Sequence, residues 1–316
     1  VFKNCTGLES AKLSSGMSRV SESLFYGCTK LTNVTIPEGI KTIDGYAFKN
    51  CTNLAGAKLP STLTKLGESA FYGCTKLTDI VIPDGVANIG SYSFKACTGL
   101  SSVTLPANLK RIDESAFYGC TALRNIEIPE GTTDIDSYVF KNCTALTNVK
   151  LPQSLVQIGE SAFYASKLNE VTIPDSVTKI SQYAFESVRN VKNMMIPSGV
   201  EEIGAAAFEA ATALYPVQDL RNVKRLGAMA FADVKNLRMI LLGENLQIYM
   251  GKAYQNTNQI IIRSGIESLY LPGGTKTSYE VLNGCTGVKS VIFGKGMTLH
   301  RGDGAYCKEL ENIVLP

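Results

Sequence analysis

The chain has 316 residues, and 45% of them are apolar, which is enough to build a sizeable core. Charged residues make up 19%, below the usual quarter, and this composition argues against an intrinsically disordered chain. The 31 basic and 28 acidic residues give a net charge of only +3, which argues against nucleic acid or an anionic membrane as the partner. A single histidine and the lack of tryptophan argue against most histidine-based catalysis. The longest apolar runs span only a few residues, so we expect neither a transmembrane helix nor a signal peptide.

Phenylalanine recurs at a fixed spacing along most of the chain. Steps of 23 residues join the first eight positions, and the next three follow at steps of 22, 23 and 23. The positions are Phe2, Phe25, Phe48, Phe71, Phe94, Phe117, Phe140, Phe163, Phe185, Phe208 and Phe231, and Tyr254 takes the next place. Cysteine stands three residues after each of the first seven, and proline recurs with the same period. Such self-similarity indicates a repeat protein.

A unit of this length is too short for a tetratricopeptide or ankyrin repeat and suits one coil of a leucine-rich solenoid. Leu31, Val34 and Ile36 place apolar side chains before and along a short strand, which Pro37 ends because proline lacks the ladder N–H. One unit cannot bury enough apolar surface alone, so stacking on its neighbours has to stabilise it. We therefore predict a leucine-rich repeat solenoid of about 13 coils of 22–23 residues. It is mainly β, with short parallel strands stacked on a concave face and little α-helix.

Two segments carry a resemblance to a known family. They are Cys28-Thr-Lys-Leu-Thr-Asn-Val-Thr-Ile-Pro37 and Ile43-Asp-Gly-Tyr-Ala-Phe48, and related segments recur along nearly the whole chain. They resemble the BspA-like, or Treponema-type, leucine-rich repeats, although here the cysteine precedes the first leucine instead of following the strand. The resemblance implies a bacterial surface or secreted protein that binds host or microbial partners, and hence an extracellular or cell-surface location.

The order within the array changes along the chain. We expect one leucine-rich repeat domain over 1–316, with regular units in a 46-residue alternation over 1–165 and divergent units over 166–257. Irregular C-terminal units with a short insertion occupy 258–316. Because the first unit begins inside the repeat and the last one is cut off, we expect the chain to be a piece of a longer protein.

The column that follows phenylalanine alternates lysine with tyrosine in the regular part. Lys49 and Tyr72 are examples, and in a solenoid such residues are lateral neighbours. A column of lysines alone would repel, whereas alternation separates the charges and offers cation–π contacts. We interpret this column as structural lining of one edge, and an aromatic and basic ligand strip is the alternative.

The nine cysteines recur mainly in one register, which predicts a column that faces the interior. Parallel Cβ vectors make poor disulfide geometry, so we interpret the column as reduced thiols that act as small apolar groups. No C-x-x-C or Cys/His cluster occurs, so we expect no metal and no cofactor. The triplet Arg301-Gly302-Asp303 matches an integrin-recognition tripeptide, but we interpret it as a turn of the repeat.

The residue between the two inward positions of each strand points away from the core. In the regular half this position is mostly polar, and its residues are Lys12, Thr35, Lys58, Val81, Thr104, Glu127 and Lys150. In the later half it becomes apolar, with Gln218 as an exception, and the candidate binding residues are Met195, Leu241, Ile261, Tyr270 and Ile292. Large exposed apolar patches mark contact sites, so we predict that this set contacts a partner protein, a second copy or a following domain. The alternative is that register shifts turn these residues inward.

These features favour a non-catalytic protein-binding or adhesion module of a bacterial cell-surface or secreted protein. Its expected partners are host or microbial surface proteins and glycoproteins, with self-association through the C-terminal half as a further option. The alternative is a structural spacer that holds another domain away from the cell surface. We expect no enzyme, because no nucleophile–base pair or phosphate-binding loop stands out. The low net charge and the short apolar runs argue against nucleic-acid binding and membrane insertion.

Overall fold

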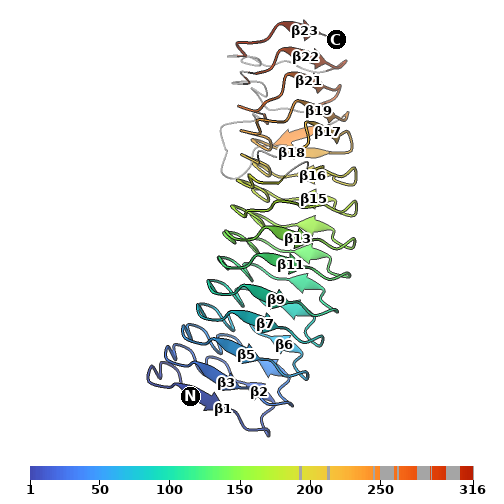
Figure 1. The fold of residues 1–316 in the computed structure, drawn as a ribbon. Helices are drawn as coiled ribbons and strands as arrows, with labels where there is room; N and C mark the ends of the chain where they lie inside the picture. Colours follow the sequence, from blue (N-terminus) through green and yellow to red (C-terminus); the bar gives the residue numbers. More distant parts are fainter. Residues whose placement is uncertain are drawn as a thin grey trace. The chain divides into compact units, whose positions relative to one another are not determined.

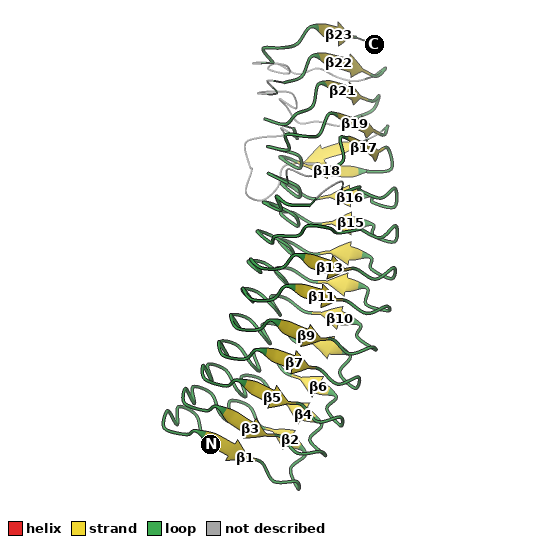
Figure 2. Cartoon of the chain, viewed as in Figure 1, coloured by secondary structure: helices red, strands yellow, loops and turns green. Residues whose placement is uncertain are grey.

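The computed structural model describes residues 1–191, 194–211, 214–244, 246–249, 260–261, 263–275, 285, 287–296 and 307–315. Within these ranges the chain is a parallel β-solenoid of about 12 turns, built from short strands and turns without a helix (Figure 1, Figure 2). The predicted fold class is confirmed, with about 12 turns in place of about 13. No helix able to cross a membrane was found in the described part.

The chain divides into two compact units, which comprise residues 1–155 with 165–167 and residues 156–164 with 168–316. In each unit the strands form two rows, which we call the front and back strands. The front strands of the first unit are β1 (Ser10–Lys12), β3 (Asn33–Thr35), β5 (Gly56–Lys58), β7 (Asp79–Val81), β9 (Ser102–Thr104), β11 (Asn125–Glu127) and β13 (Asn148–Lys150). Its back strands are β2 (Arg19–Val20), β4 (Thr42–Ile43), β6 (Lys65–Leu66), β8 (Asn88–Ile89), β10 (Arg111–Ile112) and β12 (Asp134–Ile135).

The second unit has the same two rows. Its front strands are β17 (Val217–Leu220), β19 (Met239–Leu242), β21 (Ser268–Leu271), β22 (Ser290–Phe293) and β23 (Asn312–Val314), which pair in this order as a five-stranded sheet. Its back strands are β14 (Gln157–Ile158), β15 (Lys179–Ile180), β16 (Glu202–Ile203), β18 (Arg225–Gly227) and β20 (Gln247–Tyr249). The strand pairs described are parallel, as expected when each turn repeats the one before it.

The front strands differ in length between the two units. In the first unit each front strand has three residues, and Pro37 shows the pattern by standing two residues after β3. In the second unit Arg221, Gly243 and Gly294 occupy this position, and the strands β17, β19 and β22 have four residues. Proline at this position does not by itself set the length, because β21 has four residues with Pro272 there and β1 has three residues with Ser14 there.

Phenylalanine fills the centre of both units. In the first unit neighbouring rings stack with centroids 5.1–5.8 Å apart, and in the second unit the spacing from Phe163 to Phe231 is 5.4–5.6 Å. All of these rings except Phe2 are buried. The predicted internal column is confirmed. Each ring gains both apolar burial and a stacking contact from the adjacent turn, which is why single turns depend on their neighbours.

A ladder of thiols runs beside the phenylalanine column of the first unit. Each cysteine from Cys28 to Cys143 donates its thiol to the backbone carbonyl of a phenylalanine in the preceding turn, with S···O distances of 3.0–3.2 Å. The cysteines are free, and burial raises the pKa of the Cys97 thiol to about 12. The prediction of a reduced, buried column is confirmed for these residues. Their role as hydrogen-bond donors goes beyond the small apolar role that was expected.

Where asparagine and glycine alternate in the first unit, the two adjacent turns fit closely. Asn50 and Gly73 hold the same position in adjacent turns, and both have a positive φ, of 60° and 72°. A Cβ on Gly73 would lie 2.6 Å from Oδ1 of Asn50, so the asparagine side chain fills the space beside the next turn. Gly119 follows Ala96 instead, and there the nearest atom to such a Cβ is 3.9 Å away. Asparagine does not require glycine in the next turn, however, because Ala165 follows Asn142 in this column.

Candidate binding surfaces

The front sheet of the second unit exposes a line of apolar side chains. Leu241 stands opposite Tyr270, Tyr270 opposite Ile292, and Ile292 opposite Val314 in the strand register. Tyr270 is 39% and Ile292 43% exposed, whereas Leu241 is half-buried. We call these four residues the apolar row. Side chains alternate across a strand, so all four point away from the buried core of the sheet.

Further exposed apolar residues border the apolar row. Val217 and Met239 face each other across β17 and β19 and are also exposed. They lie on the same side of the sheet as the apolar row because each is two residues from an outward position. Met195 belongs to an earlier turn and is 48% exposed, as the sequence predicted. Of the predicted set, the structure thus brings Leu241, Tyr270 and Ile292 into one line.

The predicted exposure of Ile261 is wrong. This residue is only 1% exposed, and its neighbour Ile260 accepts a hydrogen bond from the backbone N–H of Phe231. One turn earlier, the N–H of Phe208 donates the equivalent hydrogen bond to Ala230, and Ala230 directly precedes Phe231. Ile261 therefore takes the place of phenylalanine in the next turn and packs inward. Tyr254, which the spacing assigned to this place, lies outside the described residues, as does most of the predicted insertion.

The outward position assigned to Gln218 is also wrong. The register aligns Asp219 with Leu241, so the 23-residue count fails by one residue at this turn and Gln218 points inward. Its side chain is fully buried and donates to the carbonyls of Met194 and Tyr215 at 3.1 and 3.0 Å. It also accepts from the N–H of Ile196 at 3.0 Å. Among the predicted binding residues, the register-shift alternative thus holds for Ile261, but not for the exposed Met195, Tyr270 and Ile292.

Charged residues beside the apolar row pair with one another. Arg238, Glu267 and Lys289 each stand directly before a front strand, and Glu267 lies 3.9 Å from Arg238 and 4.0 Å from Lys289. Exposed pairs of this kind contribute little to stability. Because one carboxylate faces two cations, the group keeps only a single positive charge.

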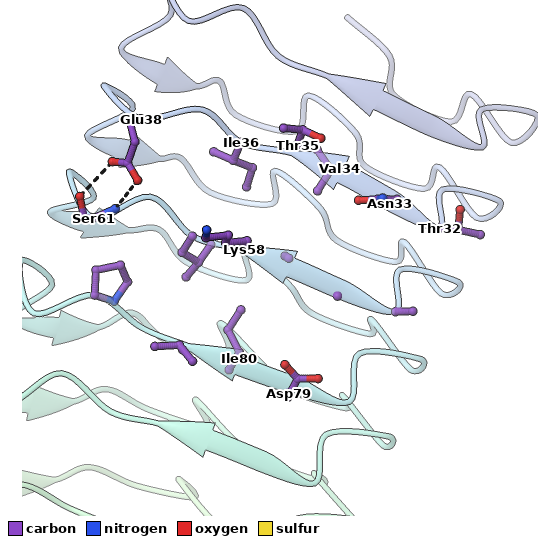
Figure 3. A pocket seen from close by; sticks show the side chains of 16 residues that line it. Thr32, Asn33, Val34, Thr35, Ile36, Glu38, Lys58, Ser61, Asp79 and Ile80 are labelled. Atoms are coloured by element: carbon purple, nitrogen blue, oxygen red, sulfur yellow. Dashed lines mark hydrogen bonds between the residues drawn. The ribbon is translucent and has the colours of Figure 1, made fainter.

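The first unit carries an open hollow of about 910 Å³ over β3, β5 and β7 (Figure 3). Small residues of β5 create it, because Gly56 stands where its neighbours carry Asn33 and Asp79. A Cβ added at Gly56 would meet no atom within 4 Å. On the rim, Glu38 accepts hydrogen bonds from the N–H and the hydroxyl of Ser61 at 3.2 and 3.0 Å. The sequence did not predict this hollow, because the prediction rested on residues that recur from turn to turn. The hollow arises from small residues in a single turn.

The lysine and tyrosine column makes the expected cation–π contacts. The Lys49 ammonium lies 5.1 Å from the ring centre of Tyr46 and 4.5 Å from that of Tyr72. Tyr46 also donates its hydroxyl to Glu68 at 2.9 Å, and the same arrangement recurs two turns later. Because the lysine and tyrosine groups partner one another, the geometry favours structural lining over a ligand strip.

Metal-binding chemistry has little basis in the part of the chain that the structure describes. No group of three histidine, cysteine or acidic side chains gathers there in a way that could hold a metal ion. The triplet 301–303 lies outside the described residues, so the structure leaves its interpretation as a turn untested.

Comparisons with known proteins agree with this architecture. A family model described as "BspA type Leucine rich repeat region (6 copies)" matches residues 1–124, 64–192, 112–238, 156–270 and 219–316. A leucine-rich repeat protein from Bacteroides ovatus aligns with a TM-score of 0.75 and 23% identity over 99% of this chain and 85% of its own. A leucine rich cell surface protein from Faecalibacterium prausnitzii gives 0.54 and 22% over 97% and 87%. The pneumococcal vaccine antigen PcpA gives 0.50 and 18% over 92% and 73%, and no curated protein matches the chain.

Proposed function

Because the chain belongs to the BspA-type leucine-rich repeat family, we propose that it is a non-catalytic module that binds proteins, with adhesion as its role. We place it outside the cell or on the surface of a bacterium. The family match and the likeness in fold to bacterial leucine-rich repeat proteins support this proposal. The cell-surface description of the Faecalibacterium prausnitzii protein supports the location.

The apolar row is the observation that carries the proposal. Tyr270 and Ile292 lie on adjacent strands and expose about two fifths of their surface. In the first unit the same outward position is mostly polar, so the fold does not require apolar residues there. Covering a whole side chain of this size contributes about 1.5–3 kcal/mol, so covering the exposed part of each gives about 1 kcal/mol. A partner that also covers Met239 and Val314 gains several such contributions from one face.

The form of the surface favours a protein partner. The charged group beside the apolar row keeps only one positive charge, which gives a polyanion little to bind. The front strands are held in a continuous ladder, so binding requires little ordering of the chain. An apolar patch on a rigid sheet suits the aromatic and aliphatic side chains of another protein.

A structural spacer is the second candidate, and the first unit supports it. There the outward residues of the front strands are mainly polar, as with Lys58 and Glu127, which is what a solvated face requires. A spacer needs no exposed apolar row. The two functions therefore differ in what they expect from changes at Tyr270 and Ile292.

A binding screen with a matched variant tests the proposal. The whole chain is measured against a panel of host extracellular glycoproteins and bacterial surface proteins on a biosensor. We expect at least one saturable interaction, which the double change Tyr270→Ser and Ile292→Ser weakens by about 10–30-fold, the equivalent of about 1.4–2 kcal/mol. The change Val156→Ser, at an exposed apolar residue directly before the back strand β14, serves as the control and should leave binding unchanged. Equal binding by both variants would remove the apolar row from the function, and no binding at all would favour the spacer.

A further inference from the structure

Two cysteines of the second unit occupy equivalent positions in adjacent turns. Cys285 and Cys307 each stand five residues before a front strand, β22 and β23, and these strands pair in register with Ser290 opposite Asn312. Neighbouring strands lie about 4.8 Å apart. Equivalent residues in such turns fall within the Cα separation of about 4.4–6.8 Å that a disulfide requires. The backbone thus places the two cysteines at bridging distance.

The side chains of this pair point differently from those of the buried ladder. In the first unit each ladder thiol is directed at a phenylalanine carbonyl, as with Cys97 and Phe71, and not at the next thiol. Cys285 instead hydrogen-bonds through its thiol to the sulfur of Cys307. The objection that parallel side chains cannot bridge therefore applies to the ladder but not to this pair.

The pair also differs from the ladder in access and in charge. Cys307 is only half-buried, whereas the ladder thiols are buried. The hydrogen bond from Cys285 lowers the pKa of the Cys307 thiol, and donating that bond raises the pKa of Cys285. The thiolate form is the nucleophile in thiol–disulfide exchange, so Cys307 is the group that reacts first.

We propose that Cys285 and Cys307 are a reactive dithiol that a small-molecule disulfide, such as oxidised glutathione, converts into a disulfide between adjacent turns, while the buried ladder stays reduced. The Cys307 thiolate attacks one sulfur of the oxidant, breaks its S–S bond and releases one glutathione thiolate, which takes up a proton. Cys285 then loses its proton to solvent and attacks the Cys307 sulfur of the mixed disulfide, which releases the second glutathione. The two cysteines are oxidised by two electrons, and the oxidant is reduced to two thiols.

The disulfide would join the turns of β22 and β23, which pair in register with Ser290 opposite Asn312. A covalent link closes a short loop between these two turns and restrains their separation in the unfolded state.

The experiment uses the whole chain in a Cys5→Ser background, because Cys5 is exposed and would take up glutathione itself. The protein is incubated with oxidised glutathione at neutral pH, quenched with acid, denatured and alkylated, and its peptides are mapped by mass spectrometry. We expect a linked peptide pair that contains Cys285 and Cys307, and alkylation of every ladder cysteine. In Cys285→Ser the glutathione should remain attached to Cys307, because the resolving thiol is missing.

Cys97→Ser is the matched control, since it removes a ladder thiol and should leave the link intact. Circular dichroism verifies that each variant is folded, and Cys285→Ala replaces Cys285→Ser if the latter fails to fold. The proposal is overturned if both thiols of the folded wild type are still alkylated after oxidation. It is also overturned if Cys307 links to another cysteine, or if glutathione persists on Cys307 while Cys285 is present.

Discussion

Replacing one ring of the phenylalanine column tests whether adjacent turns stabilise each other. Phe71 is fully buried, with ring centres 5.1 Å from Phe48 and 5.6 Å from Phe94, so Phe71→Ala leaves a cavity and removes two stacking contacts. Buried Phe→Ala changes cost about 3–5 kcal/mol, and each aromatic pair contributes about 0.5–1.5 kcal/mol. We expect a loss near the upper end, about 4–5 kcal/mol in the free energy of unfolding of the first unit.

Phe2 is the matched control. It belongs to the same column but is 44% exposed and stacks on Phe25 alone, at 5.8 Å. Phe2→Ala should cost about 1–2 kcal/mol, because less surface is uncovered and one stacking contact is lost. Urea unfolding followed by circular dichroism measures both variants, with the slope compared to detect any change in cooperativity. Similar losses of unfolding free energy for the two variants would refute the view that the phenylalanine column holds the turns together.

Three further predictions follow from particular contacts. Gly73→Ala should cost about 0.5–1.5 kcal/mol more than Gly119→Ala in urea unfolding, because both have φ near +72° but only at Gly73 does the added Cβ push an asparagine side chain off its rotamer; equal costs would contradict the close fit of Asn50 beside Gly73. Gln218→Leu should cost about 2–4 kcal/mol, because it leaves buried backbone groups unpaired, and hydrogen exchange at the Ile196 amide should speed up; unchanged exchange would contradict this role. The folded-state pKa of Cys97 lies above its unfolded value of 9.0, so the unfolded chain loses this proton first and stability falls as pH rises from about 9 to about 12, by at most about 1.4 kcal/mol per pH unit. Cys97→Ala should reduce that slope between pH 9 and 10, and an unchanged slope would show that the thiol does not ionise on unfolding.

The periodic features of the fold could be predicted from the sequence. Phenylalanine, cysteine and proline recur in fixed registers, and a stacked solenoid is the arrangement that makes such registers lateral neighbours. The stacking of Phe71 in the phenylalanine column and the contact of Lys49 with Tyr72 follow directly from this arrangement. The close fit of Asn50 beside Gly73 could not be predicted, because it depends on the direction that the asparagine side chain takes.

The candidate site was predicted in part. Tyr270 and Ile292 are exposed as expected because their strands keep the register of the repeat. Gln218 was assigned to the wrong face because its turn gains one residue relative to the 23-residue repeat. Ile261 was assigned to the wrong face because it takes the place of phenylalanine in its turn. The orientation of Cys285 toward Cys307 was not expected either, because the repeat spacing predicts the position of a cysteine but not the direction of its thiol.

Side-chain oxidation by hydroxyl radicals tests most directly whether the apolar row is the binding face. Met239 and Tyr270 are exposed and oxidisable, so they report on this face, and Tyr46 and Tyr72 of the first unit serve as internal references. In the complex with a protein that the screen identifies, we predict that oxidation of Met239 and Tyr270 falls several-fold while oxidation of the reference tyrosines stays the same. Unchanged oxidation of Met239 and Tyr270 in a saturated complex, with protection at Tyr46 or Tyr72, would place the partner elsewhere and contradict the proposed binding face.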